Sequence, residues 1–421
     1  MELSLEAYRI IINNVRSRVD LATLCLVSKG FRRVAERALY NTLFMHEAAR
    51  TKQICKALAS QSRVAELVEA LTIAIEEDDR RGEEEERVRP ETQEDIWPAI
   101  SDALKKMARL RHLSVVIDGT LSSPYSGRLA WILNDCPFRL KSFHSDMRWD
   151  EDLVRFLNVQ DEIEDLYIGD YDEGQEANPT APSRSLGAAV NPPGPSTRLR
   201  SYVSHSNLTI SPSALPHLYT LECTFSEAAI AIVPGRPVSK LKTCFSRTDP
   251  EGKREEMQVL FKALGMALAA GGWHALDIAD AEYEEKFAMD LTSTMLAGGV
   301  STRGTLKYLG TLVLPVGGRE RLLFYGHLMQ LRRLCCVELE ITAWNPSPAI
   351  VGSVAFRALG NELRLYCPGV VKIVFVSMNA GVGDDIGERT TVEWVKGEGM
   401  ARVESEVMNG MGGSEGLWRD V

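Results

Sequence analysis

A short apolar phrase recurs along most of the chain and restricts its fold more than any other feature. The phrase places apolar residues at its first, fourth and sixth positions. Its clearest copies are 110–115, 163–168, 218–223, 273–278 and 370–375. Weaker copies are 139–146, 199–206, 240–246, 306–314 and 331–341. Apolar alternation over so few residues is typical of a short strand with one buried face.

Helix-like apolar stripes lie between several of these strands. Their apolar residues recur every three or four positions over 96–107, 257–268 and 287–295, and more roughly over 322–328. Short strands that alternate with helices at a period of roughly 20–40 residues are typical of a solenoid. The pattern resembles leucine-rich repeats, although the asparagine of the usual repeat ladder is missing. The resemblance implies an irregular α/β solenoid with a curved parallel sheet. A single doubly wound α/β domain is the alternative.

Each strand of such a solenoid buries one face and leaves the other on a concave surface, where solenoids bind proteins. The polar residues inside the phrases are predicted to face that surface. They form the candidate substrate surface: His112, Ser114, Glu164, Tyr167, Tyr219, Glu222, His274 and Asp277. The alternative for each of them is an ordinary solvated position on a strand.

The first 45 residues have a different pattern. Leu5, Tyr8 and Ile12 lie on one stripe of a helix. A second helix is predicted over 21–27, with Asp20 as its N-cap, and a third begins after Ser28. The three helices together span about 36 residues, which is shorter than a domain usually needs to be to fold alone. Apolar residues also occur on more than one side of each helix, so the rest of the chain or another protein must cover the second side.

This segment resembles an F-box. The matching residues are Leu3, Glu6, Asp20-Leu21, Leu24, Val27-Ser28-Lys29, Phe31 and Leu39-Tyr40. Ser4 stands where the family usually has proline, and a serine there can cap the first helix instead. The residues after the segment are similar to those that follow the F-box in many fungal members.

F-box segments dock onto the Skp-type adaptor of a cullin–RING (SCF) ubiquitin ligase. The resemblance implies these adaptor contacts: Leu3, Leu5, Ile11, Ile12, Leu21, Leu24, Val27, Phe31, Leu39 and Tyr40. Residues 1–60 hold ten Lys and Arg against five Asp and Glu, whereas the whole chain has a net charge of −10. A basic front segment would suit an acidic adaptor surface.

Two other interpretations of the front segment remain open. Its helices can be the ordinary core of one larger domain. Residues 25–39 also resemble a bacterial helix-turn-helix, but Leu26 stands at the usual glycine of the turn, and Phe31 would fall where a recognition helix needs a polar residue. The net charge of −10 further disfavours nucleic-acid binding.

The sequence divides into an F-box at 1–45, a solenoid at 46–395 and a flexible tail at 396–421, in which Trp418 could dock back onto the chain. Within the solenoid, 76–86 is strongly acidic and predicted to be a solvated loop. Residues 174–197 contain five prolines and are predicted to be a disordered insertion.

No motif for catalysis, nucleotide binding or zinc binding occurs, and the eight cysteines lack ligand spacing. We therefore expect no catalytic residue, metal or cofactor. The sequence predicts a non-enzymatic substrate-recognition subunit of an SCF-type ligase that binds the Skp-type adaptor, through it the cullin, and a protein substrate. A scaffold without ligase function and an α/β enzyme with an unrecognised site are the alternatives. Without a signal peptide or a long apolar run, a cytoplasmic or nuclear location with no membrane partner is expected.

Overall fold

The computed structural model describes residues 4–75, 96–117, 129–169, 208–247, 249–269, 271–279, 285–297, 302–345, 347, 350, 352–378, 386–395, 400–409 and 416–421. These residues form an α/β protein with 12 α-helices, 13 strands and mostly parallel strand pairing. The chain divides into two compact units. The first comprises 1–140, 144–159 and 169–209, and the second comprises 141–143, 160–168 and 210–421. The predicted loop at 76–86 and the predicted insertion at 174–197 lie outside the described residues.

The first unit begins with three capped helices, α1 (Leu5–Asn13), α2 (Arg18–Val27) and α3 (Lys29–Tyr40). A serine hydroxyl caps each of them by accepting a hydrogen bond from a backbone N–H of the first turn. Ser4 accepts from Ala7 at 3.3 Å, and Ser28 accepts from Phe31 at 3.2 Å, as predicted. The prediction of Asp20 as the cap of the second helix is wrong, because Ser17 accepts from the Asp20 N–H and the aspartate lies inside the first turn.

The three helices share a small core. Ile12, Leu21 and Ala35 are buried together, one from each helix. Tyr8 packs edge-on against Phe31, with ring centroids 4.7 Å apart. The Tyr8 ring lies so close to α3 that a Cβ at position 30 would approach its Cε2 to 2.5 Å. The structure therefore gives Gly30 a packing role.

The rest of the first unit alternates strands and helices. Its elements are β1 (Thr42–Met45), α4 (Ala48–Ser60), α5 (Ser62–Ala65), β2 (Ala70–Ile75), α6 (Ile96–Leu104), β3 (His112–Ile117), a 3₁₀ turn η2 (Ala130–Leu133) and α7 (Glu151–Asn158). The strands β1, β2 and β3 pair in parallel. The strand β4 (Ser142–Ser145) has residues in both units.

Residues 42–45, the end of the predicted F-box, form the first strand of this sheet. The front helices are also joined to the sheet region by polar contacts. The Arg18 guanidinium donates to the carbonyl oxygens of Leu39 and Thr42, at 2.7 and 3.2 Å. Arg37 pairs with Glu69, next to β2, at 2.8 Å. The helices and the sheet of the first unit therefore share one compact body, and residue 45 does not divide them.

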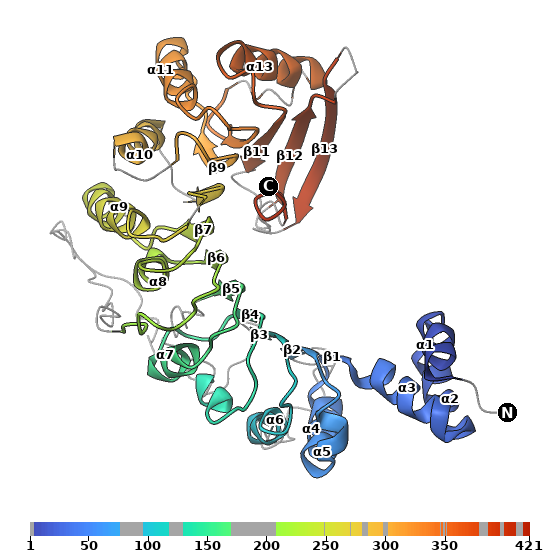
Figure 1. Ribbon diagram of the computed structural model, residues 1–421. Helices are drawn as coiled ribbons and strands as arrows, with labels where there is room; N and C mark the ends of the chain where they lie inside the picture. Colours follow the sequence, from blue (N-terminus) through green and yellow to red (C-terminus); the bar gives the residue numbers. More distant parts are fainter. Residues whose placement is uncertain are drawn as a thin grey trace, which may run out of the picture. The chain divides into compact units, whose positions relative to one another are not determined.

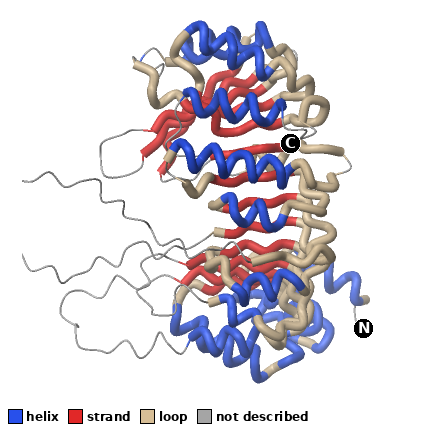
Figure 2. The backbone as a smooth tube through the Cα atoms, turned by 90° about the vertical axis from the view of Figure 1, so that its left-hand side faces the viewer, coloured by secondary structure: helices blue, strands red, loops and turns tan. Residues whose placement is uncertain are grey.

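The second unit continues the alternation. Its elements are β5 (Asp165–Ile168), β6 (Thr220–Cys223), α8 (Ser226–Ile232), β7 (Lys240–Cys244), α9 (Pro250–Leu264), β8 (Ala275–Ala279), α10 (Glu285–Ala297), β9 (Tyr308–Val313), α11 (Gly318–Leu328), β10 (Cys336–Glu340), α13 (Ser353–Tyr366), β11 (Lys372–Met378), β12 (Ile386–Glu393) and β13 (Arg402–Asn409). Helices α8 to α11 lie on the same side of the strands (Figures 1 and 2).

The strands of the second unit pair in chain order. Each strand from β5 to β11 is parallel to the next, whereas β12 and β13 are antiparallel. A doubly wound sheet would reverse its strand order at a switch point. Among the described strands of this unit no such reversal occurs, so the alternative of a doubly wound domain does not fit it.

The apolar phrases correctly predicted strand positions in both units. The fourth and sixth residues of the five clearest phrases are buried on β3, β5, β6, β8 and β11. Neither β1 nor β2 was predicted by the sequence analysis. It was wrong about the tail after 396, where 402–409 forms β13 and pairs with β12 along its whole length. Most of the described side chains of β13 are exposed, so its sequence lacks the apolar phrase that marks the other strands.

Candidate functional site

Exposed apolar side chains gather on the front helices of the first unit. Leu26 is 84% exposed and the adjacent Val27 is 61% exposed, at the end of α2. Val19, on the same helix, and Ile10, on α1, are also exposed. Val19 and Leu26 are seven residues apart and share one side of α2, roughly 150° around the helix from the buried Leu21. The helix therefore has a second apolar side that the described residues of its own unit leave open.

The residues predicted to contact the adaptor fall into groups. Leu5, Ile11 and Val27 are exposed, Leu24, Phe31, Leu39 and Tyr40 are half-buried, Ile12 and Leu21 are buried, and Leu3 lies outside the described residues. The surface assignment of Ile12 and Leu21 is wrong, because both side chains belong to the core of the three helices. The sequence analysis missed Val19 and Leu26, although the 3.6-residue period places them opposite the buried side chain of α2.

A basic cavity lies beside α3. It has a volume of about 230 Å³ and is lined by Lys29, Arg32, Arg33, Glu36, Arg63 and Leu67. Glu36 is nearly buried and accepts from Arg63 at 2.6 Å and from Arg32 at 3.1 Å. The hydrogen bond from Arg63 lowers the pKa of Glu36 most, against the opposing effect of burial. The single carboxylate leaves the cavity with an excess of positive charge, which favours an acidic partner.

A row of charged side chains crosses the sheet of the second unit. Glu222 of β6 is in register with Lys242 of β7, and Lys242 is in register with Asp277 of β8. The Lys242 ammonium lies 3.0 Å from Glu222. Asp277 accepts from the Thr311 hydroxyl at 2.8 Å and lies opposite Gly310. A Cβ on that glycine would meet the Asp277 carboxyl carbon at 2.6 Å, so the close approach requires glycine.

The environment of this row shifts its ionisation. Burial, reinforced by the charge of Glu338, raises the pKa of Asp277 to about 7. Burial of Lys242 opposes its charge, but the carboxylates of Glu222 and Asp277 outweigh that effect and raise its pKa. The row therefore keeps a lysine charged between two acids. Asp277 is 1% exposed and lines neither of the two cavities, which suits contact with the neighbouring strands more than contact with a substrate.

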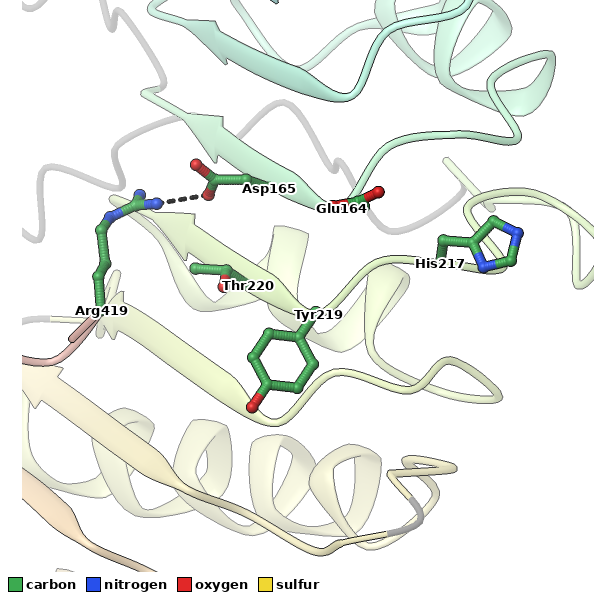
Figure 3. Close-up of a pocket in the computed structure, with 6 residues that line it drawn as sticks. All are labelled: Glu164, Asp165, His217, Tyr219, Thr220 and Arg419. Atoms are coloured by element: carbon green, nitrogen blue, oxygen red, sulfur yellow. Dashed lines mark hydrogen bonds and ion pairs between the residues drawn. The ribbon is translucent and has the colours of Figure 1, made fainter. Parts of the chain in front are cut away.

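A second cavity opens beside this row. It has a volume of about 510 Å³ and is lined by Glu164, Asp165, His217, Tyr219, Thr220 and Arg419. Figure 3 shows the Arg419 guanidinium directed at the Asp165 carboxylate at one end of the cavity. At its rim, the Tyr219 hydroxyl lies 2.8 Å from His274 Nδ1. Burial and the positive charges of Lys307, Lys240 and Arg333 lower the pKa of His274, which favours its neutral form.

The structure brings together most of the predicted substrate surface that lies in the second unit. Glu164 and Tyr219 line the cavity, His274 contacts Tyr219, Glu222 lies in the charged row and Tyr167 is half-buried on β5. The prediction that Asp277 belongs to the substrate surface is wrong, because the surrounding side chains bury it. His112 is exposed and Ser114 half-buried on β3 of the first unit, and this cavity does not include them.

Asp165, Lys242 and Arg419 are site residues that the sequence analysis missed. Alternate residues of a strand share a face, so the predicted residue Tyr167 could have indicated Asp165, two positions earlier on β5. The predicted residue Glu164 instead lies just before the strand. No local pattern indicates Arg419, which reaches Asp165 from 254 positions away.

The described residues contain no cluster of three or more histidine, cysteine or acidic side chains able to hold a metal ion. Among the helices that the structure describes, none is long and apolar enough to cross a bilayer. A scan against models of known protein families finds no match to the chain, and a search of curated protein sequences also finds none.

Proposed function

We propose that the chain is a substrate-recognition subunit of an SCF-type ubiquitin ligase. The front helices act as an F-box that binds a Skp-type adaptor. The later strands and helices act as a leucine-rich-repeat-like solenoid whose sheet face binds a protein substrate.

The exposed pair of Leu26 and Val27 carries this proposal. Two adjacent apolar side chains with most of their surface in water are costly in an isolated protein and favour burial against a partner. The basic cavity beside α3 supports the same partner, since an acidic adaptor complements its positive charge.

The proposed mechanism is proximity. A chain that holds an adaptor on one surface and a substrate on another raises the local concentration of substrate lysines near a ubiquitin-charged enzyme. Such a mechanism needs no catalytic side chain on this chain. The sheet face of the second unit offers charged and aromatic side chains of the kind that hold a polypeptide segment.

The test is co-expression of the chain with a Skp-type adaptor, followed by size-exclusion chromatography. The informative variant is Leu26→Asp with Val27→Asp, which changes exposed side chains and leaves the core of the three helices intact. Val159→Asp, at another exposed apolar position of the first unit, is the matched control.

We expect co-elution of the wild type and the control, and loss of co-elution in the double variant. Burying a leucine and a valine contributes about 3 to 6 kcal/mol together, so their loss weakens binding by roughly 100-fold to 10,000-fold. A folded wild type that does not co-elute with the adaptor refutes the F-box assignment. An adaptor complex that fails to recruit cullin would instead indicate a scaffold without ligase function.

A further inference from the structure

Residues 416–421 lie on the sheet face of the second unit. They form a tight turn, in which the Gly416 carbonyl accepts from the N–H groups of Arg419 and Asp420 at 2.9 and 3.0 Å. Gly416 has a φ of +114°, a left-handed conformation that favours glycine. The turn directs Trp418 and Arg419 at the strands. The segment binds through these side chains and adds no strand to the sheet.

Trp418 has no exposed surface. It packs against Ala275, Tyr308 and Cys336, which are in register with one another on β8, β9 and β10. Leu417 and Val421 are partly buried against the same cluster. The first residues of three neighbouring strands therefore form an apolar platform for one aromatic ring.

Arg419 binds beside that platform. Its guanidinium pairs with Asp165 of β5 and, at 2.7 Å, with Glu222 of β6, while it lies 4.6 Å from the centre of the Trp418 ring. The Lys240 ammonium donates to the Arg419 carbonyl oxygen. Burial opposes the arginine charge, but the hydrogen bond to Glu222 and the charge of Asp165 outweigh it and raise the pKa of Arg419.

The face thus has three separate means of holding a polypeptide: an apolar platform for an aromatic ring, two carboxylates for a guanidinium and a lysine for a backbone carbonyl. We propose that this face binds protein segments in which an aromatic residue directly precedes an arginine, and that residues 416–421 occupy it as an intramolecular competitor. This inference rests on the proposed function, in which the sheet face holds the substrate, and it specifies the substrate class. The cavity of about 510 Å³ next to Arg419 gives room for further residues of such a segment.

The test compares the full chain with a chain that ends at residue 415. The probe is a fluorescein-labelled peptide Gly-Leu-Trp-Arg-Asp-Val, the sequence of 416–421, and the readout is fluorescence polarisation. For an effective concentration of about 1 mM and a peptide Kd of about 10 μM, the tethered segment weakens apparent peptide binding about 100-fold. We therefore expect the shortened chain to bind the peptide about 100-fold more tightly than the full chain.

Specificity has its own controls. A peptide with Gln in place of the arginine and a Glu222→Gln variant of the shortened chain should each bind at least about 10-fold more weakly, because each loses a charge-assisted hydrogen bond. Glu255→Gln, at an exposed position of α9, is the matched control and should bind like the shortened chain. Should the shortened chain not fold, Arg419→Ala in the full chain removes the contacts to Asp165 and Glu222 and weakens the hold of the intramolecular segment. We expect this variant to bind the peptide at least about 10-fold more tightly than the wild type does.

Equal peptide binding by the full and shortened chains would overturn the competitor role. Binding that does not depend on the arginine or on Glu222 would overturn the proposed specificity. So would a folded shortened chain that does not bind the peptide. None of these measurements involves the front helices or the Skp-type adaptor, so their failure is distinct from a failure of the F-box assignment.

Discussion

Replacing Trp418 with alanine tests how residues 416–421 are held. The indole is fully buried against side chains of three strands. A tryptophan side chain buries about 200–250 Å², which at about 25 cal/mol per Å² corresponds to about 5–6 kcal/mol. That would be the loss of stability if the segment stayed in place around a cavity.

The segment has an alternative to a cavity, because it can leave the sheet. Its other main contacts are the two carboxylates around Arg419 and the hydrogen bond from Lys240, and hydrogen bonds to charged groups contribute about 1.5–3 kcal/mol each. Once the segment has left, the variant resembles a chain that lacks 416–421. The loss for Trp418→Ala therefore cannot exceed the loss for deletion, and we expect the two to agree within about 0.5 kcal/mol.

Urea unfolding of the Trp418→Ala variant and of the deletion variant measures both losses, and Trp418→Phe, which keeps a ring, is the matched control. Hydrogen exchange of 416–421 should show loss of protection in the alanine variant and retention in the phenylalanine variant. An alanine variant that is less stable than the deletion variant by more than about 1 kcal/mol would refute the reasoning. The segment without its indole would then stay in place around a cavity and not leave the sheet.

Three further predictions concern stability. Gly310→Ala should destabilise the chain by about 1–3 kcal/mol, because the added methyl group would clash with the Asp277 carboxylate. Gly304→Ala, which has open space around the added Cβ, is the control and should not destabilise the chain. Thermal unfolding compares the two variants, and equal melting temperatures would contradict the packing argument. Asp277→Asn should be more stable than the wild type at pH 8. Burial raises the folded pKa of Asp277 to about 7, above the unfolded value of about 3.9, so its contribution to stability is lost as pH rises between these values. Urea unfolding at pH 5 and pH 8 checks this, and an unchanged pH slope in the variant would contradict it. Glu36→Gln should destabilise the chain at pH 7 by no more than about 1 kcal/mol, because both partner arginines are mostly exposed. Arg63 lowers the folded pKa of Glu36, so this stability is present above the unfolded pKa and lost as pH falls through the folded one. A variant as stable as the wild type at pH 7 would show that the ion pair contributes nothing.

Local patterns predicted the fold where each element carries its own period. The alternation at Leu113 and Val115 predicted β3, and the stripe from Phe287 to Met295 predicted α10. The strands β12 and β13 were missed, since an antiparallel pair at the end of a sheet keeps fewer apolar residues than a strand flanked on both sides. The cap of α2 was assigned to Asp20 because serine and aspartate have similar cap preferences, and only the backbone geometry distinguishes Ser17 from it.

The sequence by itself determined the alternation of strands and helices, the three front helices and the strand position of Glu222. These features depend on periods of two and 3.6 residues, which neighbouring residues carry. Only the tertiary structure decided that Ile12 and Leu21 are core, that Leu26 and Val27 are exposed, and that Arg419 lies between Asp165 and Glu222. The face that a side chain presents depends on what packs against it, and a segment some 200 or more positions away leaves no trace in the local pattern.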